Sequence, residues 1–504
     1  MPECPLVLLI SSAIILRWST AYHPHSGEGK PPMYGDYEAQ RHWQEITLNT
    51  PLVHWYHNTT DNDLQYWGLD YPPLTAYHSL LLGKIARMVN PSYVELKKSR
   101  GFESPEHKHF MRLTVLATDL LIYIPSIILY FRASEGPEKS VNLRGNGNIF
   151  SLRRQHLLIL SSLLYPGLSL IDYGHFQYNS ISLGLFVLAV LGIMKDSIGL
   201  ASLFFVLALN YKQMELYHSL PFFFYILGVC VRLREKSLMA SVQLLVKTQL
   251  VVLATFFVIW APFLWMWPAA LDAVVRLFPV GRGLFEDKVA NFWCSANVLV
   301  KLKTLFSNDE LFKMSFKATI AAVFPSNLDL FLQANKEKFL LSLINTSLGF
   351  FLFSFQVHEK SILLVAVPVI LYFRRDPFFC FWFLIVSCFS MIPLIIKDGL
   401  FIAYCGSMGI YCLAVVMIIP EVMDTSGCFG RRGGRLAQGA LKVAFVCSAA
   451  GTVLLSFGSF FLEPPERYPD LFPLLVSVYS FAHFFAFLVY FNAKQFFFTG
   501  EGVR

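Results

Sequence analysis

Long apolar runs separated by polar loops dominate this chain and predict an all-α polytopic membrane protein. Fourteen runs are interpreted as membrane spans. Several are shorter than the about 20 residues that a straight helix needs to cross a bilayer, so they must draw on flanking residues. The predicted spans are residues 6–22, 112–131, 156–170, 180–194, 198–210, 217–231, 248–268, 313–332, 339–356, 361–373, 377–396, 400–420, 440–462 and 471–491.

The first run has the length of a signal-peptide core but not its flanks. No basic residue precedes Pro5, and Arg17 follows the run where a cleavable signal would have small residues. We therefore expect an uncleaved first span.

Basic residues gather in the loops that follow even-numbered spans. These loops all face one side of the membrane, and the positive-inside rule makes that side cytosolic, with both termini on it. The residues concerned are Arg132, Lys139, Arg144, Arg153, Arg154, Arg232, Arg234, Lys236, Lys336, Lys338, Arg374, Arg375, Arg431, Arg432 and Arg435.

The same parity decides the stretch Asn291 to Leu305, which is apolar enough to resemble a span. If it crossed the membrane, Lys336 and Arg374 would lie on the wrong side. We interpret it as an amphipathic helix on the non-cytosolic face that forms part of the active-site wall.

The chain is expected to form a single integral-membrane domain over residues 1–504. Two long loops, 23–111 and 269–312, lie on the non-cytosolic side, and 339–504 is a C-terminal helical part. The first loop holds the glycosylation sequon at Asn58, which fits the endoplasmic reticulum lumen. A second sequon, at Asn345, lies inside an apolar run and should be unused.

Composition narrows the functional classes. The chain is 55% hydrophobic and 15% charged, too little charge to cover a soluble protein of 504 residues. The net charge of +7 is spread over short loops and not along one stripe, so no nucleic acid is expected as a partner. No CxxC pair, phosphate loop or metal-ligand constellation is visible, so neither a metal nor a cofactor is expected.

Two acidic clusters lie in the first loop. Asp36 stands in Gly35-Asp36-Tyr37-Glu38 at the expected start of a helix, and Asp70 stands before two prolines at the head of an apolar helix. Acids at helix starts are favoured by the macrodipole and cap free N–H groups. From spacing alone, a helix cap explains each of these acids as well as a chemical role does.

Polar groups crowd two further places on the non-cytosolic side. Asp172 and His175 lie between the third and fourth spans, where polar groups are costly unless they are paired or hydrated. His358 and Lys360 join the ninth and tenth spans and so lie at the membrane boundary, well placed for a lipid phosphate. A snorkelling Lys paired with Glu is the alternative. Glu286 and Asp287, in the loop after the seventh span, belong to this second group.

Seven ordered motifs carry a resemblance to a known family. They are GDYEAQRHW, WGLDYPPLTAYH, SRGFES, LIDYGHFQYNS, YKQMELYH, FEDKVANFWC and FLFSFQVHEK, and they extend from about Ser26 to Lys360. Together they resemble the dolichyl-phosphate-glucose-dependent glucosyltransferases that build the lipid-linked high-mannose oligosaccharide. GDYEAQRHW favours the member that adds the first glucose over the sister enzyme that adds the second.

The resemblance implies a GT-C fold with its active site at the luminal face of the endoplasmic reticulum membrane. It implies dolichyl phosphate glucose as donor and Man9GlcNAc2 on dolichyl diphosphate as acceptor. It also implies inversion from a β-linked donor to an α-1,3 product.

By the same resemblance, Asp36 is the catalytic base. A single displacement needs one base for the acceptor hydroxyl and a group that stabilises the leaving phosphate. His358 is the first choice for that phosphate, with Lys360 or Arg41 assisting. Asp70 would bind a sugar hydroxyl or order the first loop. The remaining pocket candidates, without assigned roles, are His42, Asp172, His175, Glu286 and Asp287.

Two other classes of protein remain as alternatives. A lipid or sugar transporter would place its charges in the middle of spans along a central path, whereas here they crowd at span ends on one side. A structural scaffold would not require acids beside aromatic residues and His in these loops.

Overall fold

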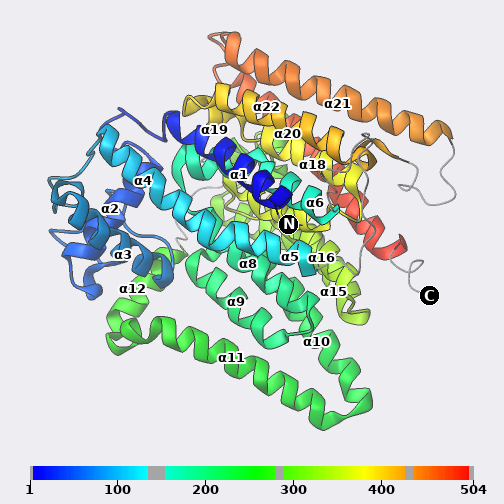
Figure 1. The fold of residues 1–504 in the computed structure, drawn as a ribbon, viewed down its shortest axis with the longest axis horizontal. Coiled ribbons are helices and arrows are strands. Elements are labelled where there is room, and N and C mark those ends of the chain that lie inside the picture. The colour runs from blue at the N-terminus through cyan, green and yellow to red at the C-terminus, as the bar shows by residue number, and fades with distance from the viewer. Residues whose placement is uncertain (1–3, 134–153, 279–287, 426–434, 499–504) are drawn as a thin grey trace.

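The computed structural model describes residues 4–133, 154–278, 288–425 and 435–498, and all regular structure in these segments is helical (Figure 1). The sequence-based expectation of an all-α membrane protein is therefore confirmed. Glu286 and Asp287, together with the basic residues of 139–153 and 431–432, lie outside the described residues.

The first half of the chain alternates loop helices with membrane helices. Its α-helices are α1 (Cys4–Ser19), α2 (Asp36–Asn49), α3 (Pro73–Val89), α4 (Pro105–Thr118), α5 (Ile124–Ala133), α6 (Arg154–Leu164), α7 (Pro166–Ser169), α8 (Asn179–Met194), α9 (Ile198–Tyr211), α10 (Ser219–Lys236), α11 (Leu238–Trp265) and α12 (Trp267–Leu277). Two π-helical turns, Asp119–Tyr123 and Leu170–Phe176, continue α4 into α5 and follow α7.

The second half of the chain contains the remaining α-helices. Its α-helices are α13 (Phe292–Leu299), α14 (Leu302–Leu305), α15 (Asn308–Leu332), α16 (Lys336–Phe353), α17 (Leu363–Tyr372), α18 (Pro377–Phe389), α19 (Ile392–Lys397), α20 (Phe401–Ile418), α21 (Arg435–Phe461) and α22 (Leu471–Ala493). A short 3-10 helix, Glu359–Ile362, leads into α17.

Within the described residues, eight helical stretches are long and apolar enough to cross a bilayer. They are Pro105–Ala133, Arg154–Phe176, Gln213–Lys236, Leu238–Trp265, Pro377–Lys397, Phe401–Ile418, Arg435–Phe461 and Leu471–Phe497. Three shorter apolar stretches are Leu6–Tyr22, Asn179–Met194 and Ile198–Tyr211. Each predicted span overlaps a helix, while the count of fourteen crossings stays a prediction.

The helices differ in how much of their surface other helices cover. The stretch Arg154–Phe176 is almost fully enclosed, and α16, α17 and α18 are also mostly buried. In contrast, α11 lies along one edge of the molecule with apolar side chains such as Leu253, Phe257 and Val258 exposed (Figure 1). A mostly apolar helix with an exposed surface is what contact with lipid requires.

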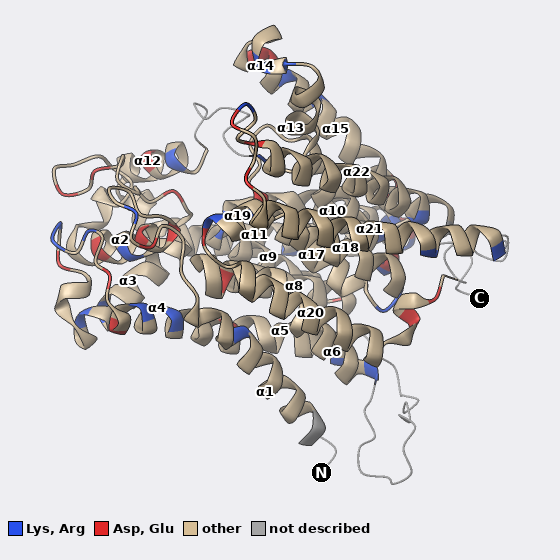
Figure 2. Ribbon diagram, turned by 90° about the horizontal axis from the view of Figure 1, so that it is seen from above, with Lys and Arg blue, Asp and Glu red and all other residues tan. Residues whose placement is uncertain are grey.

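The long first loop folds into α2, α3 and α4 at one end of the molecule, where charged residues gather (Figure 2). The predicted helix start at Asp36 is confirmed, and the expected helix after Asp70 runs from Pro73 to Val89. The structure extends the second predicted span, because α4 begins at Pro105, seven residues earlier than predicted. Ser104 caps it by accepting a hydrogen bond from the His107 amide.

The predicted amphipathic helix over Asn291–Leu305 is two short helices, α13 and α14, with a break at Val300 and Lys301. Trp293 is buried and its indole N–H donates to the Phe353 carbonyl at 2.8 Å. This anchor holds α13 against α16 and α22. The segment is therefore packed by a buried side chain and does not lie as one helix on a surface.

A buried ion pair joins the first helix to the rest of the bundle. Arg17 near the end of α1 lies 2.7 Å from Asp119, and both side chains are almost fully enclosed. The same carboxylate accepts a hydrogen bond from the Tyr173 hydroxyl at 2.8 Å, and Arg17 also donates to the Leu163 carbonyl at 3.1 Å. Three segments distant in sequence thus meet at one neutralised charge pair.

Replacing Arg17 by Ala should strongly destabilise the protein, because it leaves the Asp119 carboxylate buried without its cation. Removing one partner of a buried pair costs about 3–5 kcal/mol. Thermal unfolding of detergent-purified protein should show a large drop in Tm. Lys317→Ala on the exposed face of α15 is the matched control and should leave the Tm nearly unchanged. Equal Tm values for the two variants would contradict the structural role of the pair.

Candidate active site

A cavity of about 580 Å³ lies where the first-loop helices meet the ends of the membrane helices. Segments far apart in the sequence form its wall: α2, the loop before α3, the start of α8, the turn between α9 and α10, and the turn before α17. Of the predicted site residues, it is lined by Asp36, Asp70, His358 and Lys360.

Asp36, the first residue of α2, is held in this cavity by three residues. One of its carboxylate oxygens lies 2.5 Å from the Lys360 ammonium and 3.0 Å from His175 Nε2, and it also accepts a hydrogen bond from the Gln177 amide. Its side chain is 22% exposed. The carboxylate is thus anchored by distant segments yet remains open to the cavity.

The electrostatic surroundings keep Asp36 ionised. Burial alone would raise the pKa of the Asp36 carboxyl, but the Lys360 ammonium and His175 outweigh it and hold the pKa well below its usual value. At neutral pH the cavity therefore contains a carboxylate with an adjacent cation.

The loop before α2 is pressed against the segment that carries His175. A side chain at Gly35 would collide with the backbone of Ser26, so glycine is required by this close approach. The Ser26 amide in turn donates to the His175 carbonyl at 3.1 Å. Phe176, the next residue, has a φ of 90°, a strained value for a side chain of its size. The backbone on both sides of the Asp36–His175 contact is thus tightly constrained.

His175 does not line the cavity but lies directly behind Asp36. Its ring is 3% exposed, and its two nitrogens approach two different carboxylates. Nε2 faces Asp36, and Nδ1 lies 2.5 Å from an oxygen of Asp398, whose side chain is also 3% exposed. Asp398 comes from the turn between α19 and α20, in the C-terminal part of the chain.

Asp172 is a buried cap and not a wall residue. Its two oxygens accept hydrogen bonds from the Asn179 amide at 3.1 Å, the Asn179 side chain at 2.8 Å and the Ser180 amide at 2.7 Å. It therefore fixes the start of α8. Asn179 lines the cavity and accepts a hydrogen bond from the Lys212 ammonium, so it also positions Lys212 there.

Arg41 and His42 do not reach the cavity. Arg41 is fully buried and held by Glu38 at 2.6 Å, Glu45 at 2.8 Å and the Ser99 hydroxyl at 2.6 Å. His42 lies 3.4 Å from Glu45. With its guanidinium occupied in this network, Arg41 does not contact a phosphate in the cavity, contrary to the expectation from sequence. It holds the first-loop helices together.

The remaining candidates differ in exposure. His358 is half-exposed at the cavity, with Nδ1 at 3.3 Å from Glu359, and Asp70 is fixed by its carbonyl, which accepts a hydrogen bond from Gln213 at 2.9 Å. Asn58 is on the surface, as a used sequon requires, whereas Asn345 is buried inside α16.

Sequence reasoning missed Asp398 and Gln177 as site residues, whereas Lys212 of the motif YKQMELYH was expected to add charge on the same side of the membrane. Gln177 stands in a quoted motif but was not singled out. For Asp398 a signal existed: it follows the eleventh predicted span, so the parity of the spans places it on the same side as the first loop. Only the structure shows that it meets His175.

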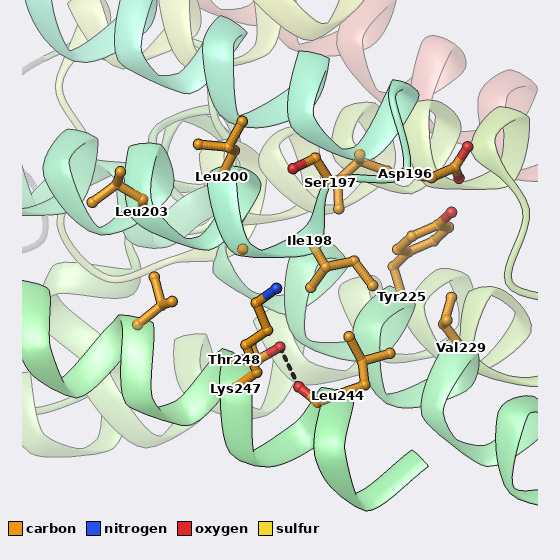
Figure 3. A pocket seen from close by; sticks show the side chains of 13 residues that line it. Asp196, Ser197, Ile198, Leu200, Leu203, Tyr225, Val229, Leu244, Lys247 and Thr248 are labelled. Atoms are coloured by element: carbon orange, nitrogen blue, oxygen red, sulfur yellow. Dashed lines mark hydrogen bonds between the residues drawn. The ribbon is translucent and has the colours of Figure 1, made fainter. Parts of the chain in front are cut away.

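A second cavity, of about 640 Å³, opens between α9, α10 and α11 (Figure 3). Its wall is mainly apolar, and its acid, Asp196, is paired with Lys336 at 2.6 Å. Asp196 follows the last turn of α8, whereas Asn179 of the first cavity begins that helix, so about 24 Å of helix separate the two. Neither cavity has a metal-ligand group of three or more His, Cys, Asp or Glu, and the described residues elsewhere have none.

An ionised acid open to a cavity beside basic side chains supplies the base and the charge-stabilising groups that a group-transfer reaction needs. Comparison with known proteins gives the family: residues 9–490 match the ALG6, ALG8 glycosyltransferase family, and the chain belongs to it.

Curated relatives agree along nearly the whole chain. The protein named dolichyl pyrophosphate Man9GlcNAc2 alpha-1,3-glucosyltransferase of Mus musculus is 47% identical over 97% of this chain and 96% of its own length. The one named probable dolichyl pyrophosphate Man9GlcNAc2 alpha-1,3-glucosyltransferase in Drosophila melanogaster is 45% identical over 97% and 98%. A solved structure, ArnT from Cupriavidus metallidurans bound to undecaprenyl phosphate, aligns over 98% of this chain and 78% of its own with 12% identity and a TM-score of 0.39.

The depressed pKa of Asp36 predicts a pH-dependent contribution to stability. A carboxyl with a lowered pKa in the folded state stabilises the protein above about pH 4 and loses that contribution as the pH falls further. The Tm of the unmodified protein should therefore fall more steeply below about pH 4 than that of Asp36→Asn. Asp309→Asn, at an exposed i,i+4 pair with Lys313, should keep the unmodified profile. Parallel profiles for the protein and Asp36→Asn would show that this carboxylate is not stabilised as described.

Proposed function

We propose that this protein transfers a glucose residue in α-1,3 linkage to Man9GlcNAc2 carried on dolichyl pyrophosphate. The names of its relatives, 47% and 45% identical along nearly the whole chain, support the acceptor and the linkage. The observation that carries the proposal is the ionised Asp36 in the same cavity as Lys360 and His358.

In this proposal the donor is dolichyl phosphate glucose and the reaction is a single displacement with inversion. Asp36 removes the proton of the acceptor hydroxyl as the new bond to the sugar forms. The leaving group is a phosphate, which is weakly basic, so no general acid is required. One open carboxylate is sufficient for this chemistry.

The donor phosphate would lie against Lys360 and His358. Both line the cavity, and both stand in the turn before α17, where the chain enters the membrane helices. A cation and an N–H donor placed where the phosphate charge develops lower the barrier to its departure. Arg41 takes no part in this contact, since Glu38 and Glu45 enclose it.

The GT-C fold, with the active site at the luminal face of the endoplasmic reticulum membrane and both termini cytosolic, is the topology that we propose. The surface position of Asn58 in the first loop supports a luminal side for that loop. The basic residues after even-numbered predicted spans support a cytosolic side opposite.

Two other functions, the sister enzyme and a transporter, can be distinguished by the acceptor used and by the product formed. The sister enzyme would require an acceptor that already carries one glucose, so paired assays with Man9GlcNAc2 and its monoglucosylated form distinguish the two. A transporter would move lipid or sugar without forming a glycosidic bond. Arg17 and Asp119, buried in the membrane helices, neutralise each other and line neither of the two cavities described above, which favours the enzyme.

Replacing Asp36 by Asn should abolish most glucose transfer. The amide keeps the shape of the side chain but cannot accept the hydroxyl proton, and positioned acid–base groups contribute about 10²–10⁴-fold to rate. The measurement is turnover of purified protein with synthetic dolichyl phosphate glucose and acceptor. Asp309→Asn is the control and should remain active. Near-normal turnover of a folded Asp36→Asn protein would rule out Asp36 as the base.

Replacing His358 by Ala should mainly weaken use of the donor. Loss of one contact to the donor phosphate should raise the donor KM or lower kcat by roughly 10-fold, the size of one hydrogen bond to a charged group. The acceptor KM should stay unchanged. His57→Ala, at an exposed site of the first loop, is the matched control. An unchanged donor KM and kcat in His358→Ala would show that His358 does not contact the donor phosphate.

A further inference from the structure

We propose that His175 and Asp398 form a proton-accepting pair behind Asp36, with His175 taking the proton that Asp36 removes from the acceptor and Asp398 acting as a positioning residue. This inference rests on the proposed function and adds a step to it. None of the seven motifs that carry the family resemblance includes Asp398.

The geometry of the ring carries the inference. His175 is almost completely enclosed, and each of its nitrogens faces a carboxylate oxygen: Nε2 at 3.0 Å from Asp36 and Nδ1 at 2.5 Å from Asp398. A neutral imidazole has one N–H and one acceptor nitrogen. The short contact to the enclosed Asp398 favours the hydrogen on Nδ1, which leaves Nε2 as an acceptor directed at the catalytic carboxyl.

Lys360 occupies that acceptor in the structure. Its ammonium lies 3.0 Å from Nε2 of His175 and also contacts Asp36. Both groups that would receive the proton are therefore held by the same cation. A donor phosphate in the cavity offers the Lys360 ammonium a new partner. If the ammonium moves to that phosphate, Asp36 and Nε2 of His175 are both released from it.

The proton can be followed from atom to atom. The acceptor O–H bond breaks as the oxygen bonds to the sugar carbon, the bond from that carbon to the phosphate oxygen breaks, and the proton goes to Asp36. It then passes to Nε2 of His175. The resulting imidazolium donates one N–H to Asp36 and one to Asp398, which both remain carboxylates. After the products leave, the proton passes from His175 back to Asp36 and from there to water at the open side of the carboxyl.

The charges around the ring favour such a step. Asp36 from α2 and Asp398 from the turn after α19 stabilise an imidazolium, whereas Lys360 opposes it. Arg112 from α4 lies nearby, donating to the Gly174 carbonyl at 2.8 Å. Once the donor phosphate neutralises Lys360, the balance shifts toward the charged ring, which is when the proton must be accepted.

The test is the pH dependence of kcat in Asp398→Asn. The amide cannot stabilise the imidazolium, so kcat should fall roughly 10- to 100-fold, within the range that acid–base positioning contributes. Both KM values should stay near those of the unmodified protein. The acidic limb of the profile should move to lower pH, because the ring loses a carboxylate that favours its protonation. Asp398→Glu, which restores the charge, should recover part of kcat and of the profile.

Asp196→Asn, in the turn between α8 and α9, is the matched control and should leave kcat and the pH profile unchanged. A purely structural role for Asp398 would lower the amount of folded protein without moving the acidic limb, and that outcome overturns the proposal. So does an Asp398→Asn protein with normal kcat. If Asp398→Asn does not fold, His175→Gln decides: a folded His175→Gln protein with normal kcat and an unchanged acidic limb contradicts the pair. Loss of activity in Asp36→Asn with none in Asp398→Asn would leave the proposed function standing without this step.

Discussion

The structure depends on keeping one carboxylate charged at the edge of a membrane. Asp36 begins a helix of the first loop, but the groups that stabilise its charge come from far along the chain: Gln177 and His175 from the end of a central helix, and Lys360 from a turn 324 residues away. Ionised groups lose hydration at such a boundary and need close partners. The packing of the first-loop helices against the bundle is therefore a condition for the charge, and the charge is a condition for the chemistry.

The hydrophobic pattern predicted the helical class and the position of the long apolar helices, because apolar runs of this length have few other folds. It also predicted the starts of α2 and α3, where acid and proline signals stand in the sequence. It failed at Asn291–Leu305, where a buried Trp293 and a break at Lys301 replaced the expected single helix. Apolar periodicity does not reveal which aromatic side chain will be the anchor.

The site was predictable only in part, and the reason is the distance between its members along the chain. Asp36 and Asp70 look alike locally, and Arg41 looks available until Glu38 and Glu45 are seen to enclose it. Asp398 carries no local signal except its side of the membrane. Pairing between segments hundreds of residues apart is a property of the packing, so the sequence of either segment alone does not contain it.

The pairing of Arg17 with Asp119 also bears on how the chain enters the membrane during synthesis. The cation of the first helix has its carboxylate partner 102 residues later. Until that partner has been made, the Arg17 cation has no carboxylate to neutralise it. The first helix therefore reaches its full stability in the bilayer only after the next one arrives. The first helix of this membrane bundle is therefore inserted before the residue that neutralises its charge has been synthesised.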